Sequence, residues 1–549
     1  MKFKRLLSIM LAFLFFLLSA CGGDTNNNTS SVTSEPTEEM LDSISLLYNS
    51  SDSLDPYKAE SKYNRILSSL LFDPLVKLDE KFQPQNVLAK EITVNGKECT
   101  VTLKSVYFTD GSLVTAEDVV FSLKKALESQ YTIYKKQLST VKTYVADGTD
   151  KVIITLSKAD PYFANLLDFP IMKKDSDTRQ DENKIELPPI GSGRYVFDTK
   201  EKTLNVNTAY FGGVPTVKLI KLVNAPDWEV TKYNLEVNNV DVYYTDLSDG
   251  VVPPMSGTVQ SVTLNNLVYL GVNLANRHVS KYQVRYAIAN ALDRSDICND
   301  AYYNFAKSAK GLFDSVWEDV GNLQNLPEKP DLENVVANLE EIGYNSKDAE
   351  GFFTDSDGKA INFKLIVSDT NEQRVKCAKL ITEQLNELGF KTELSVLDWN
   401  KYKEALTYGN FDFYLAEVKI NNNMDVSELI TSNGSLSYGI PNHVVTPEAV
   451  KPETSTPSGT EDKNNETEDN KEEIKTEFSG SSVPLIDSAV KNFYNGKLSL
   501  FDIINAFNAE MPIIPICHRN GLTVYNAEIN VANMSTISDT YFGITNKLN

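Results

Sequence analysis

The pattern of apolar and polar positions is clearest over residues 361–430, where strand-like and helix-like stretches alternate. Short apolar runs predict strands at 361–367, 391–397 and 411–418. Between the first two, apolar residues recur every three or four positions over 372–388, which predicts an amphipathic helix that Gly389 would terminate. A second, shorter helix is expected over 399–406. This alternation predicts a parallel sheet, and parallel sheets bind ligands at the carboxyl ends of their strands.

The residues that follow these predicted strands are polar or aromatic. They are Asp369, Asp398, Trp399 and the polar run 419–425. Because the carboxyl ends of parallel strands meet at one edge of the sheet, we expect a ligand to contact the protein there.

The N-terminus has the pattern of an export signal. Residues 1–5 are basic, and the apolar stretch 6–18 is too short to span a bilayer. Leu18-Ser-Ala-Cys21 resembles a bacterial lipobox, in which Cys21 would be acylated; a plain secretory signal with an accidental cysteine is the alternative. We therefore expect a signal peptide over 1–20, a disordered polar tether over 21–42, and a protein lipid-anchored to the outer face of the cell membrane.

Composition and charge exclude several classes of function. With 53 basic and 75 acidic residues, a net charge of −22 argues against nucleic-acid binding. The five cysteines are odd in number and lack CxxC spacing, and the three histidines are isolated, so neither a disulfide framework nor a metal site is predicted. Without a phosphate-binding glycine-rich loop, no cofactor is expected either.

A catalytic reading has one sequence feature in its favour. Ser122-Leu-Lys-Lys125 and Ser139-Thr-Val-Lys142 match the Ser-x-x-Lys pattern of some acyl-transfer enzymes. The companion patterns that this chemistry needs, Ser-Asp-Asn and Lys-Thr-Gly, are missing. We therefore predict that the protein is not an enzyme.

Family resemblance enters with a strand, Val106-Tyr-Phe-Thr-Asp-Gly111, followed by Val114-Thr-Ala-Glu-Asp-Val119, where the Thr115 hydroxyl is suited to cap a helix. Further pieces occur in order along the chain: Ser53-Leu-Asp-Pro56, Pro189-Ile-Gly-Ser-Gly-Arg-Tyr195, Ala209-Tyr-Phe-Gly-Gly-Val-Pro215, Leu267-Val-Tyr-Leu-Gly-Val-Asn273 and Val284-Arg-Tyr-Ala-Ile-Ala-Asn-Ala-Leu-Asp-Arg294. Over roughly residues 43–526 this ordered set resembles the peptide/nickel family (family 5) of ABC-transporter substrate-binding proteins.

The resemblance implies an α/β fold with two lobes, periplasmic-binding-protein-like (type II), with an extra subdomain in the first lobe. The expected boundaries are 43–266 for the first lobe with the subdomain at about 57–185, 267–445 for the second lobe, and 481–549 for a return to the first lobe. Residues 446–480 are acidic and of low complexity, so we expect a flexible loop that the resemblance does not cover.

The function that the resemblance implies is an extracytoplasmic solute-binding lipoprotein of an ABC importer. It would capture an oligopeptide or similar solute between its lobes, as a monomer, and deliver it to a membrane permease. Two alternatives stay open: a surface sensor or adhesion lipoprotein that kept the fold, and a binder of another cargo such as a nickel chelate or an oligosaccharide.

The resemblance also implies ligand-binding residues in the second lobe. In peptide-binding members a tryptophan at the position of Trp399 lines the pocket; the alternative here is a core aromatic. A second tryptophan follows nineteen residues later, and an aspartate three further on receives the peptide ammonium group. Val418 and Asn421 hold those positions here, so the charge that strengthens such a hydrogen bond is missing, unless Asp425 takes the role.

From the first lobe, the resemblance implies ligand contacts near three residues close to the mature N-terminus. These are Asn49, Tyr63 and Asn64. His518, after the returning strand 511–516, is a further candidate to face the ligand.

Overall fold

The computed structural model describes residues 41–440, 483–526 and 535–541. The predicted signal peptide, the predicted lipidation site Cys21, most of the predicted tether and the acidic loop lie outside the described residues. Among the helices of the described residues, none is long and apolar enough to cross a membrane.

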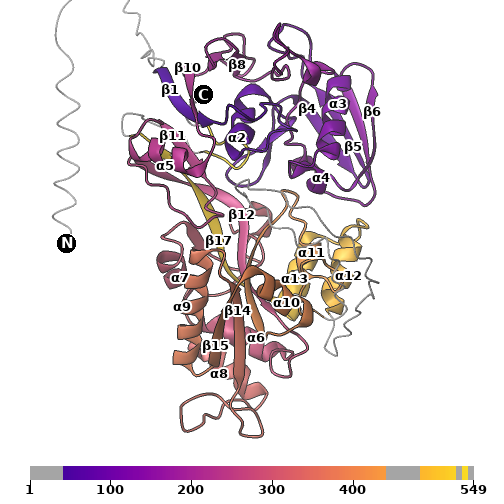
Figure 1. Cartoon of the computed structure of the whole chain (residues 1–549). Coiled ribbons are helices and arrows are strands. Elements are labelled where there is room, and N and C mark those ends of the chain that lie inside the picture. Colours follow the sequence, from indigo (N-terminus) through magenta and orange to yellow (C-terminus); the bar gives the residue numbers. More distant parts are fainter. Residues whose placement is uncertain (1–40, 441–482, 527–534, 542–549) are drawn as a thin grey trace, which may run out of the picture. The chain divides into compact units, whose positions relative to one another are not determined.

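The first lobe is built on a four-stranded sheet of order β1-β10-β9-β8 (Figure 1). Its strands are β1 (Leu41–Tyr48), β8 (Tyr195–Asp198), β9 (Thr203–Val206) and β10 (Val217–Asn224). The pair β1–β10 is parallel and the other pairs are antiparallel. Helix α2 (Lys62–Leu71) packs on β1 and β8, and α5 (Trp228–Glu236) follows β10. Buried side chains such as Ile44, Leu67 and Ile220 form one apolar core here.

An antiparallel sheet of order β4-β5-β7-β6 is inserted between β1 and β8. The elements of this insertion are β2 (Val76–Leu78), β3 (Pro84–Asn86), β4 (Ala89–Asn95), β5 (Glu98–Leu103), α3 (Ala116–Glu128), α4 (Tyr134–Gln137), β6 (Val141–Asp147), β7 (Lys151–Leu156), η1 (Phe163–Leu166) and η2 (Ser176–Thr178). We call the sheet, α3, α4 and the segment from Ser157 to Pro170 the inserted subdomain. Thr115 is the N-cap residue of α3, as predicted, and the Asp118 carboxylate accepts hydrogen bonds from the Thr115 N–H and hydroxyl.

The second lobe is built on a seven-stranded sheet of order β11-β17-β12-β16-β14-β15, with β13 paired to β17. Its strands are β11 (Val242–Thr245), β12 (Thr258–Val272), β13 (Ala306–Ser308), β14 (Asn362–Ser368), β15 (Lys391–Leu397), β16 (Phe413–Lys419) and β17 (Ile513–Tyr525). Around it lie α6 (Tyr282–Ala291), α7 (Arg294–Asp300), η3 (Glu318–Val320), α8 (Leu332–Glu341), α9 (Glu372–Leu388), α10 (Trp399–Tyr408), α11 (Ser427–Ile430), α12 (Pro484–Phe493) and α13 (Leu500–Glu510).

The predicted core of this lobe is confirmed closely. Helix α9 has the predicted bounds, and Gly389 caps it in the left-handed conformation with φ of 104°. Strand β15 also matches, whereas β14 and β16 begin one or two residues later than predicted and α10 runs two residues further. The pairs β14–β15 and β14–β16 are parallel, as the alternating pattern predicts.

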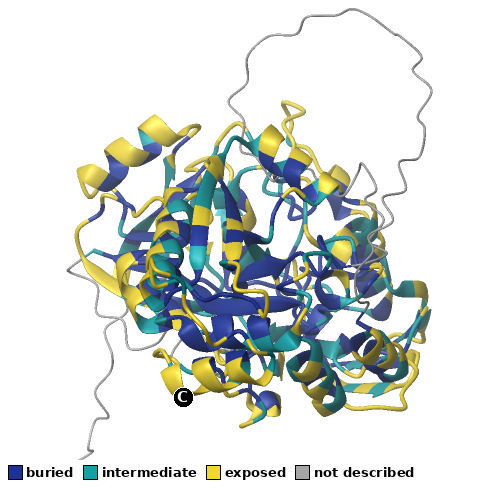
Figure 2. Cartoon of the chain, turned by 90° about the horizontal axis from the view of Figure 1, so that it is seen from below, coloured by how far each residue is buried: buried dark blue, intermediate teal, exposed yellow. Residues whose placement is uncertain are grey.

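Strand β17 is much longer than the six residues predicted, and it joins two apolar cores. Residues Ile513, Ile514 and Cys517 lie in the core of the second lobe. Further along, Leu522 and Val524 pack in a separate cluster with side chains of β1, α5 and β11. All thirteen residues of β17 are buried. Figure 2 shows buried strands, in dark blue, in the middle of the molecule and exposed residues, in yellow, on the outer faces of the helices. Together with the antiparallel β12, this strand carries the chain between the lobes.

Candidate functional site

The carboxyl ends of three strands meet at one edge of the second lobe. Because β15 and β16 both run parallel to β14, which lies between them, the segments that follow β15 and β16 leave the sheet at the same edge. Trp399 follows the end of β15 and Asn421 follows the end of β16, so both leave the sheet at this edge. Helices α9 and α10 begin here, each capped by a side chain, Asn371 and Asp398 respectively.

Trp399 is half-buried at the start of α10. Its ring stacks on Tyr402 with centroids 5.9 Å apart, and Lys403 Nζ lies 5.6 Å from the ring centroid. The indole Nε1 is buried and has no hydrogen-bond partner in the described part of the chain. An unmatched buried donor costs about 1–3 kcal/mol, a cost that an acceptor on a ligand would remove. Trp399 therefore packs against the core and also offers a free N–H group at this edge.

The turn after β16 contacts the inserted subdomain. Asn422 Nδ2 donates to Asp168 Oδ2 at 2.8 Å, and Asn423 Nδ2 donates to Asp160 Oδ2 at 2.7 Å. Asp160 is buried and Asp168 is half-buried, and loss of contact with water raises the pKa of each to about 6 despite these hydrogen bonds. The turn predicted to meet a ligand is therefore also where the second lobe is attached to the first.

Asp425 already has a cationic partner. Its Oδ2 lies 2.8 Å from Lys158 Nζ, which in turn lies 3.4 Å from the centroid of the Tyr494 ring. Burial acts to raise the pKa of Asp425, but the charge and hydrogen bond of Lys158 hold it below its usual value. The carboxylate is thus ionised at neutral pH and committed to an ion pair.

Asn421, by contrast, keeps its side chain free. Its backbone carbonyl accepts from Met424 N at 2.8 Å and from Asn265 Nδ2 at 3.4 Å. Within the residues described, no hydrogen bond involves the half-buried Asn421 side-chain amide. Of the two residues considered for the ammonium position, the neutral one is therefore the one with unused hydrogen-bonding capacity.

The structure brings the three first-lobe candidates together but gives their polar groups structural partners. Asn64 is 1% exposed, and its amide bonds to the N–H and C=O of Asn49 at 2.8 and 2.9 Å and to two further carbonyls. The Asn49 side chain accepts from Ser51 N at 2.9 Å, and Tyr63 shares a hydrogen bond of 2.8 Å with Thr231. These side chains hold the loop after β1, and their contact with a ligand stays a prediction.

His518 lies inside the protein on β17, opposite Leu267 and Lys307. It is 1% exposed, and burial lowers its pKa, so the ring is neutral at pH 7. A ligand would reach His518 only through movement of the residues that cover it.

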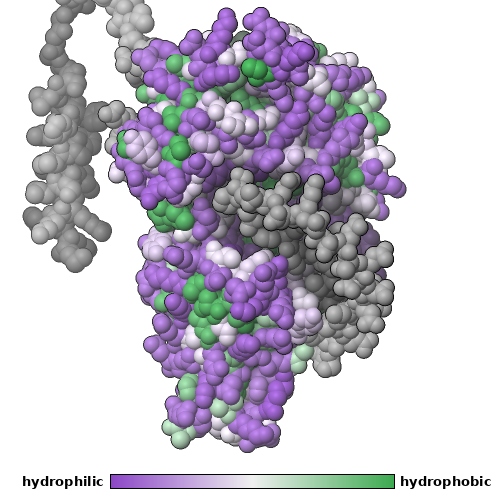
Figure 3. Space-filling view, in the orientation of Figure 1, coloured by the Kyte–Doolittle hydropathy of each residue, from purple (hydrophilic) through white to green (hydrophobic). Residues whose placement is uncertain are grey.

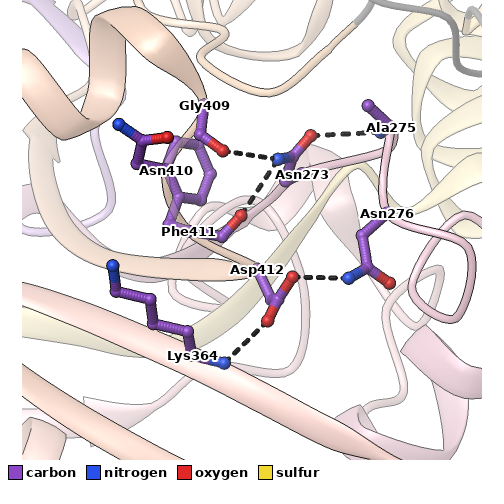
Figure 4. A pocket seen from close by; sticks show the side chains of 8 residues that line it. All are labelled: Asn273, Ala275, Asn276, Lys364, Gly409, Asn410, Phe411 and Asp412. Carbon is purple, nitrogen blue, oxygen red and sulfur yellow. Dashed lines mark hydrogen bonds between the residues drawn. The ribbon is translucent and has the colours of Figure 1, made fainter.

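A surface hollow lies at the opposite end of the strands (Figure 4). It has a volume of about 500 Å³ and is lined by Asn273, Asn276, Lys364, Asp412 and their neighbours. Its polar groups bond to each other: Asn273 Nδ2 donates to the carbonyls of Gly409 and Phe411, and Asp412 accepts from Asn276 Nδ2 and Lys364 N. The hollow lies at the amino ends of β14 and β16, whereas parallel sheets bind ligands at the carboxyl ends of their strands, so the carboxyl edge remains the candidate site. The face seen in Figure 3 is mostly hydrophilic, with small separate apolar patches.

The sequence profile of the bacterial extracellular solute-binding proteins, family 5, matches residues 81–437. The chain belongs to this family. Among curated family 5 relatives, the oligopeptide-binding protein AppA of Bacillus subtilis is 25% identical over 457 residues, covering 75% of this chain and 80% of AppA. The glutathione-binding protein GsiB of Salmonella choleraesuis is 24% identical over 387 residues, covering 67% of this chain and 72% of GsiB.

Solved family 5 structures share the fold. The substrate-binding protein CtaP of Listeria monocytogenes superposes with a TM-score of 0.62 at 17% identity, over 92% of this chain and 99% of CtaP. AppA of Bacillus subtilis, in complex with a nonapeptide, superposes with a TM-score of 0.53 at 18% identity, over 92% and 99%. A nickel ABC transporter protein of Bacillus halodurans gives 0.67 at 16% identity, over 91% and 98%. The predicted family and the two-lobed α/β fold are confirmed.

The sequence did not predict which residues of the inserted subdomain contact the turn after β16. Lys158, Asp160 and Asp168 follow β7 in an irregular segment with no spacing pattern that indicates a site. Their partners lie more than 250 positions later in the chain. The only local signal is the cluster of charged residues that ends the strand.

Proposed function

We propose that this protein is the extracytoplasmic solute-binding component of an ABC importer, which captures an oligopeptide or similar solute between its lobes and delivers it to a membrane permease. The observation that carries the proposal is the carboxyl edge, where the buried indole N–H of Trp399 lacks a partner in the described residues. At the same edge, no hydrogen bond within the described residues uses the side-chain amide of Asn421. Membership of family 5 and the likeness to oligopeptide-binding AppA support a peptide as cargo.

The two lobes would close on the ligand by a hinge movement. Strands β12 and β17 join the lobes, so bending there changes the distance between the carboxyl edge and the first lobe. A ligand that contacts both lobes stabilises the closed form by its additional contacts. The turn that holds Asn422 and Asn423 stays next to the inserted subdomain and restricts the movement to the remaining part of the edge.

The free end of a peptide would be recognised more weakly here than by an aspartate. Asn421 offers an amide, and an amide forms a hydrogen bond about half as strong as the charge-assisted bond of a carboxylate to an ammonium group. The negative charge of Asp425 is already balanced by its ion pair with Lys158. We therefore expect peptides with an acetylated amino terminus to bind within a few-fold of the free peptides.

Anchoring is a separate part of the proposal. Acylation of Cys21 would hold the protein on the outer face of the cell membrane beside its permease, and two or three acyl chains bind a bilayer firmly. Metabolic labelling with a fatty-acid probe tests this step. The expected result is that the wild-type protein is labelled and the Cys21→Ser variant is not. Equal labelling of both proteins would contradict acylation of Cys21.

The experiment that tests cargo binding begins with the purified protein and whatever co-purifies with it. Native mass spectrometry identifies a bound solute, and a peptide pool is then screened by thermal shift. At a hundredfold excess over Kd, a ligand stabilises the folded state by about 2.7 kcal/mol. A peptide that raises the melting temperature supports the proposal. If no peptide raises the melting temperature and another solute does, the peptide is the wrong cargo.

The surface sensor is the second candidate, and the loss of the carboxylate at Asn421 is the observation in its favour. Permease and ATPase genes next to this gene would favour import. If deletion of the gene leaves the uptake of a labelled ligand unchanged, the sensor is favoured.

A further inference from the structure

Three of the cysteines, which show no pairing pattern in the sequence, come together in the second lobe. They are Cys298 of α7, Cys377 of α9 and Cys517 of β17; all three are buried and have free thiols. Helix α7 packs against both β17 and α9, which brings the three thiols to one side of the sheet. No described residues form a group suited to hold a metal ion, so exchange between thiols and disulfides is the chemistry open to this cluster.

Cys298 and Cys517 are the adjacent pair. Cys517 lies opposite Ser308 in the register of β17 and β13, a position in which the Cβ atoms are about 5 Å apart. The Cys298 Sγ atom lies 4.0 Å from Ser308 Oγ. Both thiols therefore lie next to Ser308, that of Cys298 from helix α7 and that of Cys517 from strand β17.

Their surroundings make Cys298 the more reactive thiol. A hydrogen bond with Cys517 lowers the pKa of Cys298, and the charge of Arg294 acts in the same direction. The Arg294 side chain is fully buried, and one of its guanidinium nitrogens, Nη2, has no partner in the described structure. Burial raises the pKa of Cys517 and raises that of Cys377 to about 12, so these two thiols stay protonated.

We propose that Cys298 and Cys517 are a disulfide-forming pair, which a small-molecule disulfide outside the cytoplasm oxidises to a bond between α7 and β17. Disulfides persist in that compartment, where the family 5 proteins act. Cys298, at 4% exposed, is the thiol that a local opening of α7 uncovers first, whereas Cys517 is fully buried.

The reaction proceeds in two exchanges. The Cys298 thiolate attacks one sulfur of the small disulfide RSSR, forming a Cys298–SR mixed disulfide and releasing RS⁻. Cys517 loses its proton to solvent or to the released RS⁻ and attacks the Cys298 sulfur, which forms the Cys298–Cys517 bond and expels the second RS⁻. Two protein thiols have lost two electrons and two protons, and RSSR has been reduced to two RSH.

The consequence follows from the place of β17 in the fold. Its first half lies in the core of the second lobe and its second half packs against the first lobe. The bond would fix β17 to α7 one residue before His518 and close a loop of more than 200 residues, which restricts the unfolded chain strongly.

The test uses the full chain with Cys21→Ser, which removes the fifth thiol; the protein is reduced and then incubated with hydroxyethyl disulfide at pH 8. Remaining thiols are alkylated in denaturant, and the digest is mapped by mass spectrometry. Before alkylation the protein should be 2 Da lighter than the reduced form, and the digest should show Cys298 joined to Cys517 with Cys99 and Cys377 alkylated. We also expect the melting temperature to rise by about 4 °C and to return on reduction. A bond between Cys298 and Cys377, or hydroxyethyl adducts without a cross-link, would overturn the proposal.

Cys99 supplies the matched control. It is buried like Cys517, with its pKa raised by burial to about 12, but it lies in the inserted subdomain away from the other thiols. Cys99→Ser and Cys377→Ser should both keep the cross-link, and Cys298→Ser should abolish it. Because mapping of the Cys21→Ser protein identifies the bond directly, the proposal is decided even where a further variant fails to fold.

Discussion

The ion pair between Lys158 and Asp425 offers a direct test of how the lobes are attached. It joins the inserted subdomain to the turn after β16 at 2.8 Å, with side chains 31% and 15% exposed. Lys136 of α4 and Glu428 of α11 join the inserted subdomain to the helix that follows this turn, at the same distance, but they are 64% and 49% exposed. The two pairs differ mainly in their exposure to water, so one serves as the control for the other.

The expected magnitudes follow from that difference. Exposed ion pairs contribute about 0–1 kcal/mol, because water screens the charges and the side chains lose entropy. Removing one partner of a fully buried pair costs about 3–5 kcal/mol. The partly buried pair of Asp425 lies between these limits, and its Lys158 also contacts the Tyr494 ring. We expect Asp425→Ala to cost about 2 kcal/mol of unfolding free energy, with a coupling energy to Lys158→Ala of about 1.5 kcal/mol.

The assay is a double-mutant cycle by denaturant unfolding at pH 7 on both pairs. The coupling between Lys136 and Glu428 should be below about 0.5 kcal/mol. The lowered pKa of Asp425 sets the pH dependence: its contribution is present above the unfolded value of 3.8 and is lost as the pH falls through the folded value. Equal coupling energies for the two pairs, or a coupling at Lys158 that persists in acid below the folded pKa, would refute the reasoning.

Three further predictions concern stability and binding. Asp539→Ala should cost about 3–5 kcal/mol in denaturant unfolding because it removes the buried carboxylate that pairs with the fully buried Arg194 and with Lys77. Asp42→Ala, which removes only an exposed ion pair with Lys218, should leave the midpoint unchanged; equal effects would contradict this. The pKa of Asp168 is raised to about 6, so the folded protein binds a proton at Asp168 more tightly than the unfolded chain does. The unfolding free energy of the wild type minus that of Asp168→Asn should therefore fall as the pH rises from 4 to 6, measured by unfolding at several pH values. A constant or rising difference would contradict this. Trp399→Ala should weaken ligand binding at least about tenfold by calorimetry, and Tyr408→Ala, at the other end of α10, should not; equal losses would remove Trp399 from the site.

Local patterns predicted the second lobe well because its elements are defined within short stretches. The apolar face of α9 and the glycine at Gly389 fix that helix without reference to distant residues. Strand β17 was predicted too short because its apolar run ends at Ile516, after which His518, Arg519 and Asn520 are polar. These polar residues are buried nonetheless, since β17 lies between β11 and β12 and Arg519 pairs with Glu417.

The site could be predicted only in part. The parallel strands placed Trp399 and Asn421 at one edge correctly, because strand direction follows from the alternation of strands and helices. The partners of Asp425 and Cys298 could not be predicted, because contacts between residues more than 200 positions apart leave no periodic signal in the sequence. Asn64 shows a further limit: the sequence gives the residue type, but the loop carbonyls that use its amide depend on the folded backbone.

The central claim is that a solute binds between the lobes at the carboxyl edge. Hydrogen–deuterium exchange with and without a saturating ligand from the thermal-shift screen tests it most directly. We predict that exchange slows together in residues 397–400 of the second lobe and in residues 49–53 of the first, the loop after β1 that the Asn64 amide holds. Protection confined to one lobe, or protection around the hollow at Asn273 and Asp412, would contradict the account.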